Sequence, residues 1–375
     1  MQQNPPVVKK HQTYDGLDLM KAIAIYFVLI YHFPIMEVDF IGTGKTGAYS
    51  NFFIFSIFST CVPIFFFING ALLFNKPGLS LKAHVSKILK TVILVIIWGF
   101  ITMISLSLIN GESISVSGII KDIYTLKTGW VNHLWFLEAL VVIYIFFPLL
   151  FLAFKTKKSY FFFFFACLMI LSFGNTFIGL LLNVASTVSG KFLNTYFFLN
   201  YFGGFNAFSG IYGFSIGYFM LGGIVFSMKD SILTNRNRIL SFIAIPVSMV
   251  LLFSYGVPIS FRQGETWDIG FEAFDSVFAL VMVVSIFILS MQYNNRGLSG
   301  KIIRHVSKNT LGIYLLHRIV GALIKPFFME FSFFSTFIGG MVFTGAVLFL
   351  CLLIIYIMKK IPYFNYLFSL KLKLA

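Results

Sequence analysis

The stretch TVILVIIWGFITMISLSLI, residues 91–109, decides the fold, because it runs for nineteen residues without one ionisable side chain. A helix needs about 20 consecutive apolar residues to cross roughly 30 Å of hydrocarbon. Comparable apolar runs recur along the whole chain of 375 residues. The sequence therefore predicts an all-α, polytopic integral membrane protein built as a helical bundle.

The composition excludes a water-soluble globular protein. Apolar residues make up 58% of the chain, charged residues only 11%, and the mean hydropathy is +0.91. Soluble domains carry about 25% charged residues. The net charge of +15 does not indicate nucleic-acid binding, because the basic residues lie in short clusters between apolar runs rather than along one face or tail.

Hydropathy windows of about 19 residues predict ten transmembrane helices. One membrane domain is expected to fill residues 1–375, with short cytoplasmic tails at 1–16 and 359–375 and no extracellular soluble domain. Asparagines and glycines interrupt segment 184–206, which we expect to be re-entrant or interfacial, or to hold an extra crossing. The ten spans lie near 17–35, 51–74, 88–109, 134–154, 160–183, 207–227, 239–256, 271–291, 310–328 and 335–358.

The connections between these spans alternate in charge. Twenty of the 28 lysines and arginines lie in the tails and in every second connection, whereas six lie in the other connections. Short cytoplasmic loops are enriched in Lys and Arg. Both termini are therefore expected in the cytoplasm, which agrees with an even number of spans.

Ionisable residues inside the spans are few, and each costs at least about 2.5 kcal/mol in hydrocarbon. The first span contains Asp18 and Lys21 near its cytoplasmic end and His32 near its outer end. Lys21 and His32 are eleven residues apart, so they share a helix face about 16.5 Å apart along the axis. One interpretation is structural, with an Asp18–Lys21 pair, a snorkelling Lys21 and His32 at the outer interface. The other is a reaction path, with a cation that holds a phosphate and an imidazole that moves a proton.

The segment YDGLDLMK, residues 14–21, together with His32 resembles the opening of the acyltransferase-3 family of integral membrane acyltransferases. The first helix of that family carries an Arg, ten residues and a His. Here the basic residue is Lys21, which keeps the charge but lacks the planar fork that grips phosphate oxygens. Further segments similar to family motifs follow in order: VPIFFFING (62–70, with Asn69 where Ser is usual), HLWFL (133–137), GYFMLG (217–222) and LGIYLLH (311–317, followed by Arg318 where Pro is usual).

The resemblance implies transfer of an acyl group, commonly acetyl, from acyl-CoA to a hydroxyl of a cell-surface glycan or its lipid-linked precursor. Acetyl-CoA would be the donor substrate in the cytoplasm, and only its thin pantetheine arm would cross the membrane. Lys21 and Asp18 would belong to the donor site at the inner mouth. His32 would act either as general base on the acceptor hydroxyl or as an acylated nucleophile, and the sequence leaves both routes open. The residue usage, rich in Lys, Ile, Phe and Asn, suggests a bacterial cytoplasmic membrane.

Glu138 lies just over one turn into the fourth span, at a depth similar to that of His32. We expect it to orient the imidazole of His32, as the third member of a nucleophile–base–orienter set does. The alternative is a neutral Glu138, or one paired with Arg318. His133 and Trp135, at the start of that span, have the position of interfacial belt residues, and the resemblance favours a role in substrate binding.

His317 and Arg318 lie midway through the ninth span, on a face shared with Tyr314. A mid-bilayer Arg must face the bundle interior and find an acceptor. That acceptor could be a carboxylate of Glu138, Glu272 or Asp275, or the phosphates of the donor. The sequence therefore places His317 and Arg318 among the candidate donor-binding residues.

No metal site is predicted, because no histidine-rich set has metal-ligand spacing and no glycine-rich phosphate loop occurs. Cys61, Cys167 and Cys351 lie inside apolar runs and are expected to be small buried side chains.

The competing function is that of a transporter or flippase for a lipid-linked sugar or small acid, since intramembrane charges also suit a proton-coupled path. Transporters often contain two similar halves, and the segments of residues 14–140 do not recur after residue 200. Membrane lipid is the expected surrounding, and the oligomeric state is not predicted.

Overall fold

The computed structural model describes residues 14–33, 36–113, 115–125, 131–190, 204–294, 297–362 and 364–368. Within these residues all regular structure is helical, which confirms the predicted all-α class. The elements are α1 (Asp15–His32), α2 (Phe40–Thr43), α3 (Thr46–Phe55), η1 (Ser56–Thr60), α4 (Cys61–Phe74), α5 (Leu81–Asn110), α6 (Val116–Thr125), η2 (Asn132–Leu134), α7 (Trp135–Thr156), α8 (Lys158–Met169), η3 (Ile170–Gly174), α9 (Asn175–Ser189), α10 (Ile211–Ser227), α11 (Lys229–Ile232), α12 (Asn235–Gln263), α13 (Val277–Ser290), α14 (Gly297–Met329), η5 (Ser332–Ser335), α15 (Phe337–Met358) and η6 (Phe364–Phe368).

Seven helical segments in the described residues are long and apolar enough to cross a membrane. Helices α10 and α13 are apolar but shorter, and α1 has eighteen residues with its acidic side chains in the first turn. Each of the ten predicted spans coincides with one of these ten segments, so the chain is a multi-pass membrane protein. The seven segments are 46–74, 81–110, 132–156, 158–189, 235–263, 297–329 and 337–358.

Several helices extend beyond the spans predicted from hydropathy. Their ends are polar, and capping residues stabilise them. The seventh span, predicted at 239–256, is the longer helix α12. The Thr234 side chain accepts a hydrogen bond from the Asn237 backbone N–H at its start, and Gly264 ends it with a φ of 77°. A side-chain oxygen before the first turn and a left-handed glycine after the last turn satisfy backbone groups that a helix leaves open. Hydropathy alone does not detect such ends.

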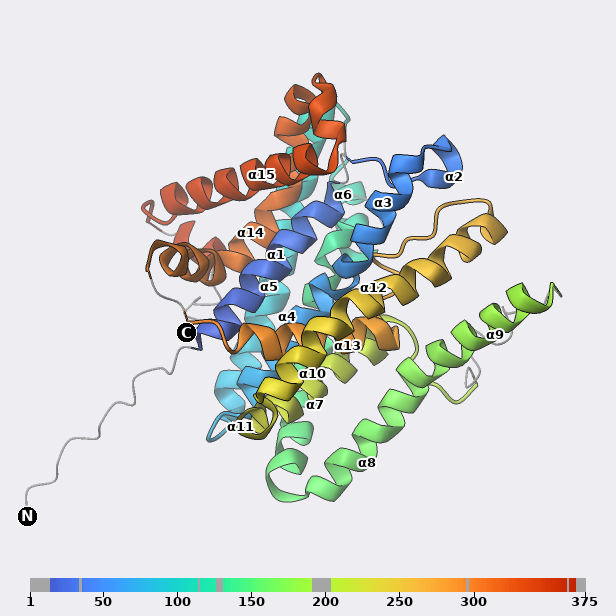
Figure 1. Cartoon of the computed structure of the whole chain (residues 1–375). Coiled ribbons are helices and arrows are strands. Elements are labelled where there is room, and N and C mark those ends of the chain that lie inside the picture. The colour runs from blue at the N-terminus through green and yellow to red at the C-terminus, as the bar shows by residue number, and fades with distance from the viewer. Residues whose placement is uncertain are drawn as a thin grey trace, which may run out of the picture.

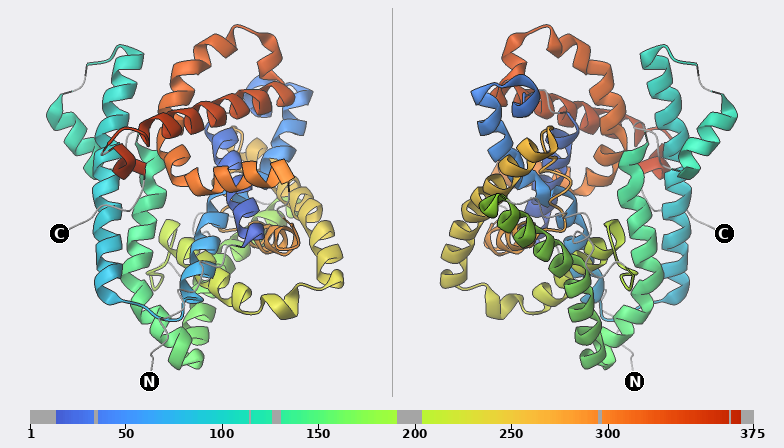
Figure 2. Two further views of the ribbon diagram at one scale, coloured as in Figure 1. Left: turned by 90° about the vertical axis from the view of Figure 1, so that its left-hand side faces the viewer. Right: turned by 90° about the vertical axis from the view of Figure 1, so that its right-hand side faces the viewer.

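Helix α1 occupies the centre of the bundle (Figure 1), where it packs against α14, α4, α13 and α15. Helix α7 packs instead against α5, α10, α8 and α4. Figure 2 shows α5 and α7 side by side on one flank of the bundle and α12 on the opposite flank. Because α1 is central, its outer end can meet side chains from several other helices.

Helices α4 and α10 approach each other closely through glycines. A Cβ atom at Gly70 would overlap the carbonyl oxygen of Phe219, and one at Gly222 would overlap that of Phe67. Small residues allow helix backbones to come together in a membrane, where packing rather than hydrophobic transfer drives association. The segments VPIFFFING (62–70) and GYFMLG (217–222) therefore meet in a close helix–helix contact, which their glycines permit.

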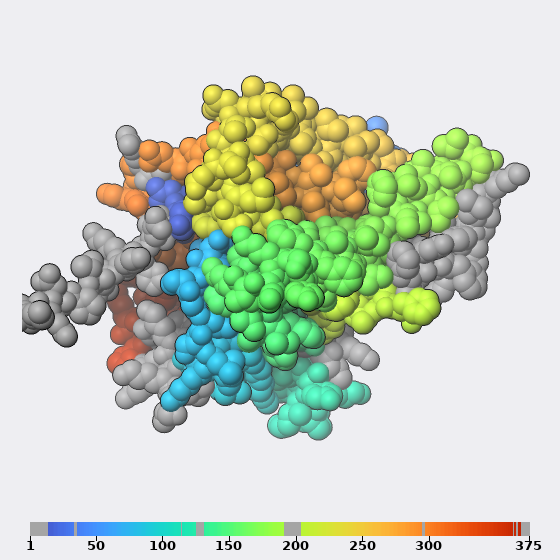
Figure 3. Space-filling model, turned by 90° about the horizontal axis from the view of Figure 1, so that it is seen from below, coloured from blue at the N-terminus to red at the C-terminus, as the bar shows by residue number. Residues whose placement is uncertain are grey.

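Three of the basic connections lie at one end of the molecule. Figure 3 shows this end, formed by the start of α5, the α7–α8 connection and the region of α11. The grouping agrees with the charge alternation in the sequence.

The predicted re-entrant segment 184–206 is described only in part. Helix α9 includes residues 184–189 and ends at Gly190, whereas residues 191–203 lie outside the described residues.

Candidate functional site

Three imidazoles from distant parts of the chain form a cluster, which we call the histidine cluster: His32, His133 and His317. The ring centroid of His317 lies 5.0 Å from that of His32 and 5.4 Å from that of His133. His32 is the last residue of α1, His133 lies in η2 just before α7, and His317 is in α14. The helical geometry of α1 and its packing on α14 therefore create a site that no single segment contains.

His317 is completely buried, and its environment selects one tautomer. Its Nδ1 atom lies within hydrogen-bond distance of the backbone carbonyl of Tyr314. A carbonyl oxygen can only accept, so Nδ1 must carry the hydrogen, and Nε2 of the neutral ring keeps its lone pair. Among the described residues, Nε2 has no hydrogen-bond partner. His317 therefore presents a proton acceptor inside the protein.

Tyr314 joins the cluster to the core one turn earlier on α14. Its hydroxyl donates to the backbone carbonyl of His133, and its ring centroid lies 5.8 Å from those of both His133 and His317. The His133 ring is also buried, with 2% of its surface exposed. These contacts position His133 and His317 relative to each other.

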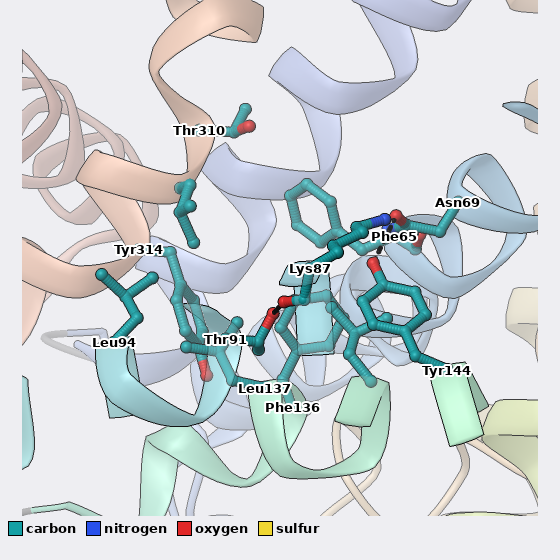
Figure 4. Close-up of a pocket in the computed structure, with 12 residues that line it drawn as sticks. Phe65, Asn69, Lys87, Thr91, Leu94, Phe136, Leu137, Tyr144, Thr310 and Tyr314 are labelled. Atoms are coloured by element: carbon teal, nitrogen blue, oxygen red, sulfur yellow. Dashed lines mark hydrogen bonds between the residues drawn. The ribbon is translucent and has the colours of Figure 1, made fainter. Parts of the chain in front are cut away.

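One cavity, which we call the inner cavity, reaches Tyr314 from the side of the basic connections. It has a volume of about 190 Å³ and lies between α4, α5, α7 and α14. Figure 4 shows its wall, in which apolar side chains alternate with a few polar ones. The lining residues are Phe65, Asn69, Lys87, Thr91, Leu94, Phe136, Leu137, Leu140, Tyr144, Thr310, Leu311 and Tyr314. A space this small admits a slender chain but not a nucleotide.

Lys87 is the cation of the inner cavity. Its Nζ atom lies 3.9 Å from the centroid of the Tyr144 ring, and the Tyr144 hydroxyl donates to Oδ1 of Asn69 over 3.2 Å (Figure 4). Among the described residues, the ion pairs do not include Lys87. Lys87 is half-buried, and removing an ammonium from water is costly unless an anion or a π face compensates it. Lys87 therefore suits an anionic or strongly polar ligand at the entrance to this cavity.

A second cavity, which we call the outer cavity, lies on the other side of the histidine cluster. Its volume is about 500 Å³, within the range of about 300–1,000 Å³ found for ligand pockets. His32 forms part of its wall, and the loop after α12 supplies much of the rest. Its lining residues are Tyr31, His32, Val38, Asp39, Phe52, Phe55, Glu265, Thr266, Trp267, Asp268 and Ile269.

Tyr31 connects the wall of the outer cavity to His32. Its hydroxyl donates to Oδ2 of Asp268 over 2.6 Å, and its ring meets the His32 ring edge-on with centroids 5.4 Å apart. The ring packs directly on Gly270, where a Cβ would come within 2.6 Å of it. Tyr31 is thus fixed from two sides, and it limits the positions that the His32 side chain can adopt.

Asp39 forms a second fixed carboxylate of this cavity. Its Oδ1 accepts from the Thr266 hydroxyl over 2.6 Å and from the Gly42 backbone N–H over 2.9 Å. These hydrogen bonds stabilise the ionised form and lower the pKa of the Asp39 carboxyl below its ordinary value. Asp39 is therefore a carboxylate at neutral pH.

The predicted donor residues near the start of α1 form a small polar group. Lys21 lies 3.9 Å from Asp18 as an ion pair, and the Ser307 hydroxyl of α14 donates to Asp18 over 2.5 Å. Both ionic side chains remain partly exposed. Lys21 and His32 do lie on one continuous helix, as predicted, but Lys21 is not among the residues that line the inner cavity.

His317 lies with the histidine cluster at the end of α1 that carries His32, not with Lys21 at the other end. The structure thus separates His317 from Lys21, and the donor-binding role of His317 stays a prediction. Arg318 is half-buried, and its charge acts on both His32 and His317.

Trp135 has a packing role in the structure. Its ring packs against Phe66, Phe214 and the loop before α13.

The expectation that Glu138 faces His32 is wrong. Glu138 is exposed, its Oε1 lies 3.4 Å from the Tyr212 hydroxyl, and it lines a separate apolar cavity with residues of α5 and α6. It follows Leu137, which lines the inner cavity, and one residue turns a helix by about 100°. Helix α4 packs against both α1 and α7, so similar depth in the membrane did not imply proximity.

The sequence reasoning missed Lys87, Tyr31 and Asp268. Lys87 lies just before the third predicted span, at 88–109, but in the structure it is nearly two turns inside α5. The signal available for Asp268 was its place in the acidic segment ETWD, residues 265–268, in an outward connection. Nothing local pairs that segment with Tyr31, because the contact joins the end of α1 to the loop after α12.

Neither a metal site nor a disulfide is found among the described residues. No group of three or more His, Cys, Asp or Glu side chains there is arranged to hold a metal ion. The three cysteines are free thiols; Cys61 and Cys351 are buried, and Cys167 is half-buried. The expected small buried role is thus met by two of them.

The chain matches a known protein family. The model of the acyltransferase-3 family, described as an acyltransferase domain, matches residues 14–359. No curated protein and no solved structure matches the chain. The matched range includes all three members of the histidine cluster and both cavities.

Proposed function

Because the chain belongs to the acyltransferase-3 family and is therefore a multi-pass membrane acyltransferase, we propose that it acylates a glycan across the membrane. The donor is cytoplasmic acyl-CoA, most simply acetyl-CoA. The acceptor is a hydroxyl of a cell-surface or lipid-linked glycan, and the membrane is the bacterial cytoplasmic membrane. The observation that carries this proposal is the position of the histidine cluster between two cavities, one on each side.

The inner cavity suits the donor. Its volume of about 190 Å³ matches a thin arm rather than the whole coenzyme, so the nucleotide stays outside it. Lys87 faces the cavity, and an ammonium binds phosphate as a point charge. Lys21, at the same end of the bundle, adds positive charge for the nucleotide. Tyr314 stands between this cavity and the histidines, and its ring must move aside for a thioester to reach them.

The outer cavity suits the acceptor, because His32 forms part of its wall. In the proposed step, His32 removes the proton from an acceptor hydroxyl. The oxygen then attacks the thioester carbonyl, a C–O bond forms, the C–S bond breaks, and the leaving thiolate takes up the proton. General-base catalysis of this kind contributes about 10² to 10⁴ in rate. The alternative route, an acyl group held on the His32 imidazole, predicts a trapped acyl-enzyme when the acceptor is omitted.

The direct test uses the purified protein in liposomes with labelled acetyl-CoA on one side and a glycan acceptor on the other. His32→Ala should lower transfer by about 10² or more, while His305→Ala should leave it unchanged, since His305 is exposed near the start of the same helix as His317. Near-normal transfer by His32→Ala would refute the assignment. Movement of a glycan without label on it would instead support the transporter alternative.

A further inference from the structure

The outer cavity is acidic as well as aromatic. Three carboxylate residues line it, Asp39, Glu265 and Asp268, and none of the described residues that line it is a lysine or arginine. Arg318 acts on His32 without lining the cavity, and two basic residues of the neighbouring segments make contacts elsewhere. Lys45 lies 3.9 Å from Glu37 in an ion pair, and Arg262 donates to Asn183.

Two of these carboxylates, Asp39 and Asp268, are held in place by hydrogen bonds but keep free acceptor capacity. Asp268 accepts one hydrogen bond on each oxygen, from the Tyr31 hydroxyl and the Phe271 backbone N–H. A carboxylate has about four lone-pair sites, so two remain. Hydroxyl and ammonium groups can donate to those sites, whereas a second carboxylate or a phosphate cannot.

The aromatic part of the wall adds a flat apolar surface. Trp267 is 8% exposed and packs edge-on against Tyr255, with centroids 5.3 Å apart. Its backbone N–H donates to the Ser260 hydroxyl, which anchors this part of the loop, and the packing on Tyr255 holds the indole. A rigid aromatic face with acceptors at its edge suits a ring that has apolar C–H faces and hydroxyls at its rim.

We propose that the outer cavity selects neutral or amino-bearing sugars as acceptors and rejects anionic ones, with Asp39, Glu265 and Asp268 as the specificity-determining residues. This inference rests on the proposed function, because it takes the outer cavity as the acceptor site. All three carboxylates are exposed at the cavity wall, so together they repel an anion through water, most strongly at low ionic strength. Charge repulsion therefore disfavours an anionic sugar whatever its shape, and this repulsion supplies the specificity.

Glu265 gives the cleanest variant, because it is exposed and a substitution there leaves the Tyr31–Asp268 hydrogen bond in place. Glu265→Lys reverses one charge of the cavity. The matched control is Glu112→Lys, which makes the same charge change at an exposed position after α5 and outside the cavity lining.

The experiment measures binding of methyl β-glucoside, methyl β-glucosaminide and methyl β-glucuronide to the purified protein at low ionic strength, by saturation-transfer NMR. Labelled acetyl transfer to the glucoside is measured in the same sample. We expect the glucuronide to bind about fivefold or more weakly than the glucoside, and the difference to shrink with added salt. Glu265→Lys should reduce the discrimination, and Glu112→Lys should not.

The outcomes separate the two proposals. Equal binding of glucuronide and glucoside, a ratio unchanged in Glu265→Lys, or no glycoside binding at all would overturn the charge-selection inference even if label is transferred. Discrimination that responds to Glu265→Lys, without any transfer of label, would retain the inference and overturn the proposed function.

Discussion

His32 and His317 lie with their ring centroids 5.0 Å apart, although one ends the first helix and the other is in α14. The contact pairs a half-buried imidazole that lines the outer cavity with a completely buried one. Because the Tyr314 carbonyl fixes a hydrogen on Nδ1 of His317, the second ring presents only its Nε2 lone pair. The pair can therefore accept a proton and hold it away from water.

Replacement of His317 should impair chemistry rather than donor binding. His317→Gln keeps a polar side chain but removes the imidazole base, so transfer should fall by about 10² to 10⁴ with the KM for acyl-CoA unchanged. Steady-state kinetics in liposomes measures both parameters. His305→Gln, at an exposed position of α14, is the matched control. A change confined to KM would place His317 in the donor site instead.

Lys87 should determine donor affinity. Lys87→Met keeps much of the side-chain volume and removes the charge that lies over the Tyr144 ring. A charged hydrogen bond contributes about 1.5–3 kcal/mol, so the KM for acyl-CoA should rise about tenfold or more, with a smaller effect on kcat. Lys82→Met, at an exposed position five residues earlier, should leave KM unchanged. An unaltered KM in Lys87→Met would remove this residue from the donor site.

Glu138 should be dispensable for catalysis, because its carboxylate faces Tyr212 rather than His32. Surface substitutions typically change free energies by less than about 0.5 kcal/mol, so Glu138→Gln should retain the transfer rate to within about twofold. Loss of an orienting carboxylate costs about 10⁴ in rate in enzymes that depend on one. A loss of that size here would mean that Glu138 reaches His32 in the working enzyme.

The glycine contact between α4 and α10 should contribute to the thermal stability of the protein. Gly70→Ala places a Cβ against the Phe219 carbonyl oxygen, and overpacking of this kind costs about 1–3 kcal/mol, which thermal unfolding in detergent would detect as a lower Tm. Gly345→Ala is the control, because a Cβ there meets no atom within 4 Å. Alanine is the better helix former by up to about 1 kcal/mol, so the control should be neutral or stabilising. Equal effects of the two substitutions would contradict the close α4–α10 packing.

The sequence by itself determined the helices, because the cost of an unsatisfied backbone in hydrocarbon makes long apolar runs helical whatever surrounds them. It also determined that Lys21 and His32 share one helix, since that spacing depends only on helical periodicity. Position within the spans supplied Glu138, His317 and Arg318 as candidates, the family resemblance favoured His133 and Trp135, and the match over residues 14–359 confirmed the family.

Tertiary structure decided which candidates meet. His317 joins His32 because α14 packs on α1, whereas Glu138 turns away because α7 packs elsewhere and α4 lies against both. Tyr31 and Asp268 meet only because the loop after α12 folds over the end of α1. Hydropathy and periodicity are local properties of a segment, but the rotation of one helix relative to another depends on side chains distant in the sequence, such as the glycines that set the spacing of α4 and α10.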